Sequence, residues 1–278
     1  MVSLAEREHA EKIRSAIAAS KIPPLVVPQE TFARLRAPAE TTPFPLDYAF
    51  HLLGDIKGKT VLEYGCGDGR YTVLLAERGA KVIALDISAP LLALARKRLE
   101  INGCEGVELM LGSAHALPLP DESVDIIFGM AILHHLDLKL ASREVQRVLR
   151  KGGRGIFKEP IRNSKLVAWL RQFLPKHGDV SPFERPLTDR EIKDFAMPYE
   201  QRARTFQLPL SRIAHILGHG RAVDFSAHVD SYLLRRFPSL IYYGAVKVFE
   251  IVKPQKAQVD SFNEYCGCVA APATDDQC

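Results

Sequence analysis

The hydrophobic pattern of the chain changes period several times between residues 60 and 160. Short apolar runs with β-branched residues predict strands there, and longer stretches with helical spacing separate them. The predicted strands cover residues 60–64, 82–85, 107–111, 124–130 and 155–158. The predicted helices cover residues 71–78, 90–102 and 138–149. Strands that alternate with helices over short connections are typical of a mostly parallel, doubly wound α/β sheet with helices on both faces.

The flanking segments have looser patterns. At the N-terminal end we predict an amphipathic helix over residues 4–19. An extended proline-rich connection over residues 23–45 would wrap the core, and a short helix would follow at 45–53. At the C-terminal end we predict helices at 163–173, 189–195 and 208–234, and strands at 199–206 and 241–252. Thr188 is the expected N-cap of the second of these helices, with Glu191 at its third position.

These patterns divide the chain into four parts. We expect an N-terminal helical cap or lid (1–57), a cofactor-binding core (58–160), a C-terminal part of the same domain with a helical insertion and the last strands (161–253), and a flexible tail (254–278). The last strands would bring the sheet to seven.

Composition narrows the class of protein. The chain has 278 residues, of which 47% are hydrophobic, and a net charge of +4. No dense run of Lys and Arg occurs, so nucleic-acid binding is not expected. No apolar run reaches the length of about 18 residues that a membrane span requires, although a peripheral membrane contact stays open. The N-terminus has no secretory pattern and the five cysteines do not form a disulfide framework, so we expect a reduced, cytoplasmic protein.

The densest chemical signal is the turn that follows the first core strand. Residues 61–69 read VLEYGCGDG, an apolar strand followed by glycines at alternate positions and then a helix. Glycines there let backbone N–H groups approach a ligand closely. Asp86 ends the next strand, where a carboxylate can accept hydrogen bonds from both hydroxyls of a ribose. The spacing is Gly-x-Gly-x-Gly and lacks the third glycine position of a dinucleotide turn.

Four ordered segments carry a family resemblance. They are VLEYGCGDG, VIALDIS, GSAHALPLPDESVDIIFGMAILHHL and EVQRVLRKGGRGIFKEP. The chain resembles, over about residues 45–160, the class I S-adenosylmethionine-dependent methyltransferases, in the ubiquinone/menaquinone-methyltransferase-like, type 11 group. The resemblance implies a Rossmann-like fold, S-adenosylmethionine as cofactor, and a small-molecule methyl acceptor.

The resemblance also implies which residues hold the cofactor. The methionine end would lie against Glu63, Gly65, Cys66, Gly67 and Gly69. Beyond this turn, Asp86 would bind the ribose, Ile87 would contact the adenine, and Met130 would lie near the sulfonium. The family usually has an aspartate after the third strand, where it accepts a hydrogen bond from the adenine amino group. This chain has Ser113 and Ala114 there, whose hydroxyl and backbone N–H are the candidate adenine contacts.

Residues after the fourth and fifth strands are candidates for catalysis. His134 lies within reach of the expected methyl group, and a histidine can remove a proton from a hydroxyl near neutral pH. It could equally shape the pocket through a hydrogen bond. Lys158 and Glu159 face the same side, either as an ion pair or as part of the catalytic machinery.

Aromatic residues in 160–240, among them Trp169, Phe206 and Tyr232, suggest a hydrophobic or ring-bearing acceptor, although they could also be core or interface residues. We expect no metal: Cys266, Cys268 and Cys278 lack a fourth ligand. Two alternative functions stay open, a nicotinamide-dependent oxidoreductase and a non-catalytic protein that retains the fold. The oligomeric state and the acceptor atom do not follow from the sequence.

Overall fold

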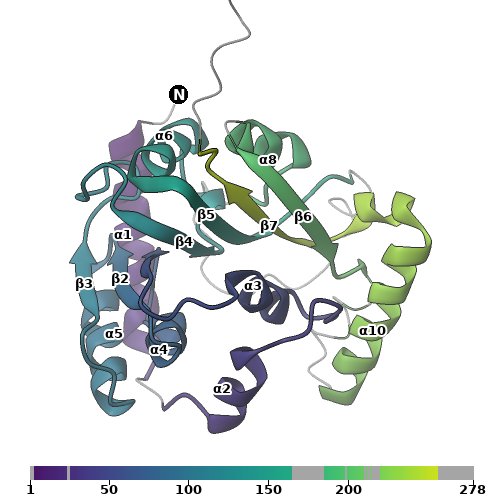
Figure 1. Ribbon diagram of the computed structural model, residues 1–278, viewed down its shortest axis with the longest axis horizontal. Coiled ribbons are helices and arrows are strands. Elements are labelled where there is room, and N and C mark those ends of the chain that lie inside the picture. Colours follow the sequence, from purple (N-terminus) through teal and green to yellow (C-terminus); the bar gives the residue numbers. More distant parts are fainter. Residues whose placement is uncertain are drawn as a thin grey trace, which may run out of the picture.

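A seven-stranded sheet runs through the computed structural model, with helices on both of its faces (Figure 1). The structure describes residues 3–23, 26–164, 185–197, 199–209, 211, 214 and 220–255. The strand order is β3-β2-β1-β4-β5-β7-β6. All pairs are parallel except those of β7, which is antiparallel to β5 and β6. This confirms the predicted fold class.

The elements follow the predicted rhythm closely between residues 60 and 160. The strands are β1 (Thr60–Tyr64), β2 (Lys81–Asp86), β3 (Glu108–Leu111), β4 (Val124–Met130), β5 (Leu149–Pro160), β6 (Glu200–Phe206) and β7 (Val246–Val252). The helices are α1 (Leu4–Lys21), α2 (Gln29–Arg36), α3 (Pro45–Leu53), α4 (Arg70–Glu77), α5 (Ala89–Ile101), α6 (Leu138–Val148), α8 (Asp189–Ala196) and α10 (Gly220–Arg236), with short 3₁₀ helices η1 (Leu133–His135) and η3 (Pro238–Tyr243).

The apolar runs bury residues on both faces of the sheet, as parallel strands require. Along β1, Val61 packs into the core on one face and Leu62 into the core on the other. Along β4, Ile126 and Phe128 belong to the first core and Ile127 to the second. The first core lies under α3, α4 and α5, and the second under α6 and α8.

Two predictions about the flanks were wrong. The proline-rich segment 23–45 contains a helix, α2, because residues 29–37 hold no proline and begin and end next to Pro28 and Pro38. The last strand begins at Val246, not at Ile241, because Pro238 starts a 3₁₀ helix over the preceding residues. The predicted capping box of Thr188 and Glu191 is confirmed at the start of α8. The predicted helix at 163–173 lies outside the described residues.

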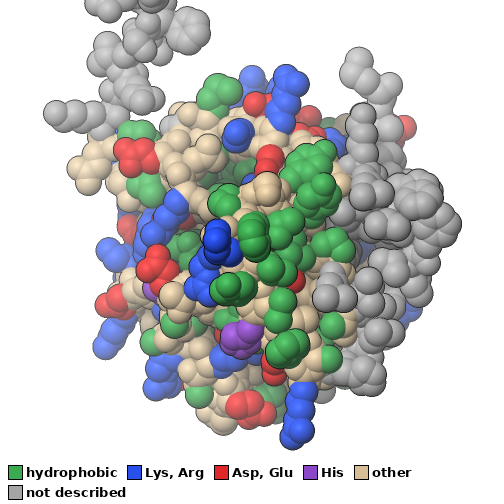
Figure 2. Space-filling view, turned by 90° about the vertical axis from the view of Figure 1, so that its right-hand side faces the viewer, with side chains coloured by type: hydrophobic (Ala, Val, Ile, Leu, Met, Phe, Trp, Pro, Cys, Tyr) green, Lys and Arg blue, Asp and Glu red, His purple; other side chains and the backbone are tan. Residues whose placement is uncertain are grey.

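The carboxyl ends of β1, β2 and β4 lie at one edge of the sheet, and α1 covers this edge while it contacts α5 (Figure 1). On another side of the molecule, where α10 lies, hydrophobic side chains gather at the surface (Figure 2). Phe225, Tyr232 and Phe237 are exposed there. None of the helices in the described ranges is both long and apolar enough to cross a bilayer.

Candidate functional site

The glycine turn after β1 has a backbone that requires glycine. Gly65, Gly67 and Gly69 have φ values of 80°, 54° and 76°, a region that residues with a Cβ rarely adopt. A Cβ at Gly65 would lie 2.7 Å from a side-chain carbon of Ile132, and one at Gly69 would lie 2.9 Å from Cα of Ala95. A Cβ at Gly67 would meet no atom within 4 Å. The turn therefore packs tightly at its ends and opens onto free space in its middle.

Asp86 is joined to this turn at the end of β2. One carboxylate oxygen accepts a hydrogen bond from the N–H of Gly67 at 2.8 Å, and the other accepts one from the N–H of Ser88 at 2.9 Å. Burial raises the pKa of Asp86 although both amide bonds oppose the shift, and the nearby Glu11 raises it further. The structure thus brings the predicted ribose acid into contact with the predicted turn.

Glu63, next to the last residue of β1, is buried. The hydroxyl of Thr72 on α4 donates to one of its carboxylate oxygens at 2.5 Å. The other oxygen is buried and has no hydrogen-bond partner among the described residues. Burial raises the pKa of Glu63 to about 8, so a large fraction of this side chain is protonated near neutral pH.

A cavity of about 220 Å³ lies between this edge of the sheet and α1. Six of the predicted cofactor residues line it: Gly65, Gly67, Asp86, Ile87, Ala114 and Met130. Four others lie beside it without lining it: Glu63, Cys66, Gly69 and Ser113. The volume is below the range of about 300–1,000 Å³ typical of small-molecule sites because α1 occupies the entrance.

The α1 residues that line this cavity were not predicted from the sequence. Oε1 of Glu8 accepts hydrogen bonds from the Ser113 hydroxyl and, at 3.0 Å, from Nδ1 of His115. An oxygen of Glu11 lies 3.3 Å from Nδ1 of His135. The only available signal was that these acids share the polar face of an amphipathic helix, and that signal does not say which surface the helix covers.

His134 follows β4 and is buried against Glu159 of β5. Its Nδ1 lies 2.7 Å from one oxygen of Glu159, whose other oxygen accepts bonds from the backbone N–H groups of Ile132 and Leu133 at 2.9 and 2.8 Å. Glu159 therefore pairs with His134, and not with Lys158 as one of the sequence alternatives proposed. Lys158 is largely buried, and this burial lowers its pKa.

His134 lines a second cavity, of about 1,060 Å³, which also reaches α6 and α8. Arg7 and Leu136 line both this cavity and the smaller one under α1. The two spaces therefore adjoin at the carboxyl edge of the sheet. The aromatic residues expected to form an acceptor pocket do not line either space where the structure describes them: Phe206 is buried elsewhere, and Phe225, Tyr232 and Phe237 are exposed. Trp169 and Phe173 lie outside the described residues.

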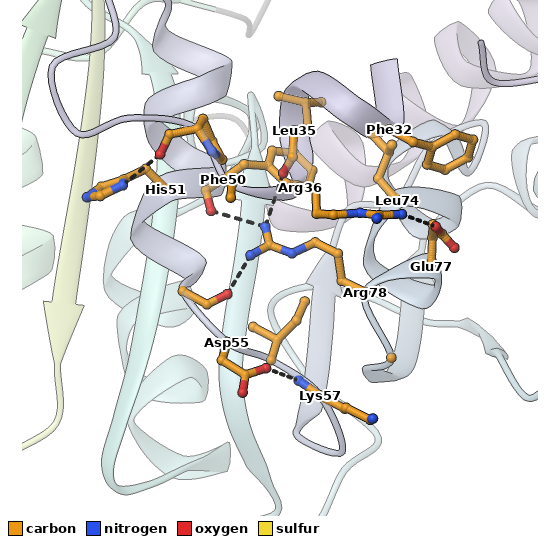
Figure 3. A pocket seen from close by; sticks show the side chains of 15 residues that line it. Phe32, Leu35, Arg36, Phe50, His51, Asp55, Lys57, Leu74, Glu77 and Arg78 are labelled. Carbon is orange, nitrogen blue, oxygen red and sulfur yellow. Dashed lines mark hydrogen bonds and ion pairs between the residues drawn. The ribbon is translucent and has the colours of Figure 1, made fainter. Parts of the chain in front are cut away.

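A third cavity, of about 870 Å³, lies between α2, α3 and α4 (Figure 3). Lys57 and Gly79, which precede β1 and β2, line it, so it lies at the amino ends of these strands. Its central cation, Arg78, donates to the backbone carbonyls of Phe50 and Gly54. The functional groups of this cavity are thus used within the protein, and we do not assign it a ligand.

Comparison with known proteins identifies the domain. Residues 62–157 match the family model described as a methyltransferase domain. The chain is 31% identical over 162 residues to malonyl-[acyl-carrier protein] O-methyltransferase from Hamiltonella defensa, and 30% identical over 147 residues to demethylmenaquinone methyltransferase from Lactococcus lactis. These alignments cover 57% and 51% of this chain, and they span 60% and 58% of those relatives.

Solved structures share the fold at lower identity. A putative sarcosine dimethylglycine methyltransferase from Galdieria sulphuraria aligns with a TM-score of 0.55 and 15% identity, over 82% of this chain and 87% of that one. Geranyl diphosphate C-methyltransferase from Streptomyces coelicolor aligns with a TM-score of 0.54 and 17% identity, over 75% and 76% of the two chains. Residues 62–157 thus match a methyltransferase domain, and the chain shares its fold with solved structures that are named methyltransferases.

Proposed function

We propose that this protein binds S-adenosylmethionine under α1 and transfers its methyl group to a small molecule. The observation that carries the proposal is the hydrogen bond from the N–H of Gly67 to Asp86. It holds a carboxylate beside a backbone segment that opens onto free space. The acids Glu8, Glu11 and Asp86 line the same cavity, together with Arg7 and Arg14. A carboxylate beside the turn suits a ribose better than a pyrophosphate.

The residues present fit the three parts of this cofactor. Asp86 would bind the ribose hydroxyls, Gly65 and Gly67 leave room for the methionine part, and Ile87 offers an apolar contact for the adenine. Glu63 lies just before the turn, where Thr72 holds one of its carboxylate oxygens, and its other oxygen is buried beside the cavity. When bound, the cofactor supplies a methyl group that a sulfonium has already activated.

We place the acceptor in the adjoining cavity beside His134. Arg7 reaches both spaces, so an acceptor there would lie next to the cofactor end of the site. The chain must align the acceptor atom with the methyl group and exclude water. With Nδ1 held by Glu159, Nε2 of His134 is the nitrogen suited to take a proton from the acceptor.

The chemical class of the methyl acceptor is proposed on different grounds from the cofactor. Relatives and structural neighbours are named for malonyl-[acyl-carrier protein], demethylmenaquinone and geranyl diphosphate. These names include a carrier-protein thioester, a quinone and a lipid-like diphosphate, so they agree on no single chemistry. We retain a small, hydrophobic or ring-bearing acceptor as the first class to test.

Calorimetric titration with S-adenosylhomocysteine and with a nicotinamide dinucleotide tests the donor. We expect binding of the first, with a Kd of about 1–100 μM, and a loss of at least about tenfold in affinity in Asp86→Ala, since the ribose contacts disappear. Asp121→Ala is the matched control because this carboxylate is exposed and lies at the opposite edge. Heat with the nicotinamide compound alone would overturn the proposal.

Labelled methyl transfer from S-adenosylmethionine to a panel of quinones, phenols, fatty acyl thioesters and polar metabolites then tests the acceptor. Product formation with an apolar member supports the class proposed here. Product formation only with polar metabolites contradicts it. Tight cofactor binding with no product across a whole metabolite extract would favour the non-catalytic alternative.

A further inference from the structure

The loop after β3 lacks the acid that this family usually has at that position, but an acid from another element occupies the region. Ser113 stands at the family's acidic position, and the carboxylate of Glu8 on α1 lies against its hydroxyl. We propose that Glu8 is the residue that recognises the adenine amino group of the cofactor. This assignment rests on the proposed function, because it takes S-adenosylmethionine to be the ligand.

A chain of hydrogen bonds fixes the orientation of Glu8. The N–H of Asp137 donates to Nε2 of His115 at 2.9 Å, so the proton of the neutral imidazole is on Nδ1. Nδ1 then donates to Oε1 of Glu8 at 3.0 Å. The N–H of His115 donates to the Ser113 hydroxyl at 3.1 Å, and this hydroxyl donates to the same Oε1. Because both the Ser113 hydroxyl and Nδ1 of His115 donate to Glu8, this side chain must accept, as an ionised carboxylate does.

The electrostatics agree with this geometry. Partial burial favours the neutral form of Glu8, but the hydrogen bonds from Ser113 and His115 outweigh it and lower its pKa. Both donors bind Oε1, and among the described residues neither a hydrogen bond nor an ion pair reaches Oε2. Because Glu8 lines the cavity, this second oxygen is an acceptor available to a ligand there.

A donor accompanies this acceptor. The backbone N–H of Ala114 has no hydrogen-bond partner among the described residues, and Ala114 also lines the cavity. The buried hydroxyl of Tyr64 donates to the carbonyl of Ala114 and fixes this residue in place. The cavity wall thus offers one acceptor oxygen and one donor N–H from adjoining residues.

This pair matches adenine and does not match hypoxanthine. The pairing edge of adenine carries an amino donor beside a ring-nitrogen acceptor. Hypoxanthine reverses both groups, so a carbonyl oxygen would face the Glu8 carboxylate and a ring N–H would face the Ala114 N–H. Both mismatched pairs would be buried without hydrogen bonds, which is the arrangement that gives enzymes strong discrimination.

The assignment makes α1 part of the base-binding site. Glu8 reaches the cavity only when α1 covers the carboxyl edge, whereas Asp86 and the glycine turn belong to the sheet itself. Glu8 could instead serve only to attach α1 to the loop after β3. The two roles differ in one measurable property, which is the preference for one base over the other.

The experiment measures the affinity of the full chain for S-adenosylhomocysteine and for its hypoxanthine counterpart, S-inosylhomocysteine, by calorimetry. For the wild type we expect the adenine compound to bind at least about 100-fold more tightly. In Glu8→Gln the side-chain amide can turn its NH₂ toward the hypoxanthine carbonyl, and we expect the preference to fall below about 10-fold. Glu8→Ala should also lose most of the preference.

Glu100→Gln is the control, because Glu100 is an exposed acid of α5 outside the cavity. This variant should prefer the adenine compound as strongly as the wild type does. Thermal unfolding verifies that each variant folds. If the Glu8 variants lose affinity for both compounds by the same factor, Glu8 only attaches α1 to the loop after β3 and does not recognise the adenine. If the wild type binds neither compound, the proposed function itself fails, and this outcome is distinct from an unchanged ratio.

Discussion

Three buried acids near the carboxyl edge of the sheet show how local contacts give chemically similar side chains different properties. Asp86 accepts two backbone hydrogen bonds at the end of β2. Glu159 accepts two more and also contacts His134. Glu63 has a single hydroxyl partner and a buried oxygen without one. We therefore expect Glu63 to be the acid whose charge is least stabilised by the fold.

The first prediction concerns the pH dependence of stability. The folded pKa of Glu63, about 8, lies above the ordinary value of 4.5. Protonated Glu63 therefore contributes to the stability of the folded protein. This contribution is fully present below about pH 4.5 and is lost as the pH rises through about 8. Glu63→Gln should remove this loss, so that the stability of the wild type relative to the variant falls by about 1 kcal/mol per pH unit across that window.

Urea denaturation of both proteins between pH 5 and 9 measures this difference, with the folded state verified by circular dichroism. Asp121→Asn, at an exposed carboxylate, should leave the pH dependence of the wild type unchanged. Parallel curves for the wild type and Glu63→Gln would show that Glu63 ionises normally in the folded protein.

The second prediction concerns His134. If Nε2 removes a proton from the acceptor, His134→Asn should reduce kcat by about 10²–10⁴-fold at neutral pH while the cofactor Kd stays within about twofold. Glu159→Gln can keep its oxygen on the N–H groups of the turn, but its NH₂ would then donate to Nδ1 and leave the imidazole proton on Nε2, so kcat should fall and its pH profile should shift to lower pH, since the carboxylate that favours imidazolium is gone. A reduction below about tenfold, with an unchanged profile, would restrict His134 to shaping the pocket.

Contacts between single residues were predictable from the sequence only where they are local. The glycine turn and Asp86 belong to consecutive strand–helix units, so their meeting follows from the alternating pattern. The pairing of Glu159 with His134 joins residues from two strands, and that of Glu8 with His115 joins residues more than 100 positions apart. No periodicity in the sequence encodes such contacts.

Among the elements, α1 is the helix that covers the candidate site. Its amphipathic pattern predicted the helix, and a capping box of Ser3 and Glu6 determines where it begins. The pattern did not indicate that its polar face, with Glu8 and Glu11, would lie over the cavity. A polar face normally points to solvent, and here it covers a polar site, which hydrophobic periodicity cannot distinguish.

The third prediction is that cofactor binding stabilises α1 against local opening. The cavity of about 220 Å³ is too small for free exchange of a cofactor while α1 is docked. Hydrogen exchange should therefore show α1 opening in the free protein, and S-adenosylhomocysteine at 100 times its Kd should slow this exchange by up to about 100-fold.

Mass spectrometry of peptides from residues 4–21 provides the measurement, and peptides from α10 serve as the control because α10 lies away from the cavity. Equal protection of both helices would indicate global stabilisation. No protection of α1 would show that this helix does not close on the ligand.

At the scale of the whole molecule, the two ends of the sheet differ in what their polar groups do. The carboxyl edge leaves acceptors and donors open to a cavity, as the Glu8 and Ala114 groups show. The amino edge uses its groups for structure, with Arg78 bound to carbonyls from α3 and the turn after it. The alternating core made the sheet predictable, whereas α2 and η3 lie in the proline-bearing flanks and were missed, because each is a short helix that begins at or next to a proline and has no long apolar periodicity.

The last prediction separates these two ends. Arg78 donates to the carbonyls of Phe50 and Gly54 (Figure 3). Its guanidinium carbon also lies 5.7 Å from the centroid of the Phe50 ring. Arg78→Met keeps the length of the side chain but leaves these carbonyls without their charged donor, so the free energy of unfolding should fall by about 1.5–3 kcal/mol. Arg36→Met, which breaks an exposed pair with Glu77, should cost less than about 1 kcal/mol. Because both sites lie at the amino end of the sheet, calorimetry should give the wild-type Kd for S-adenosylhomocysteine in each variant, and a tenfold weaker affinity in a folded Arg78→Met would show that the two ends are coupled.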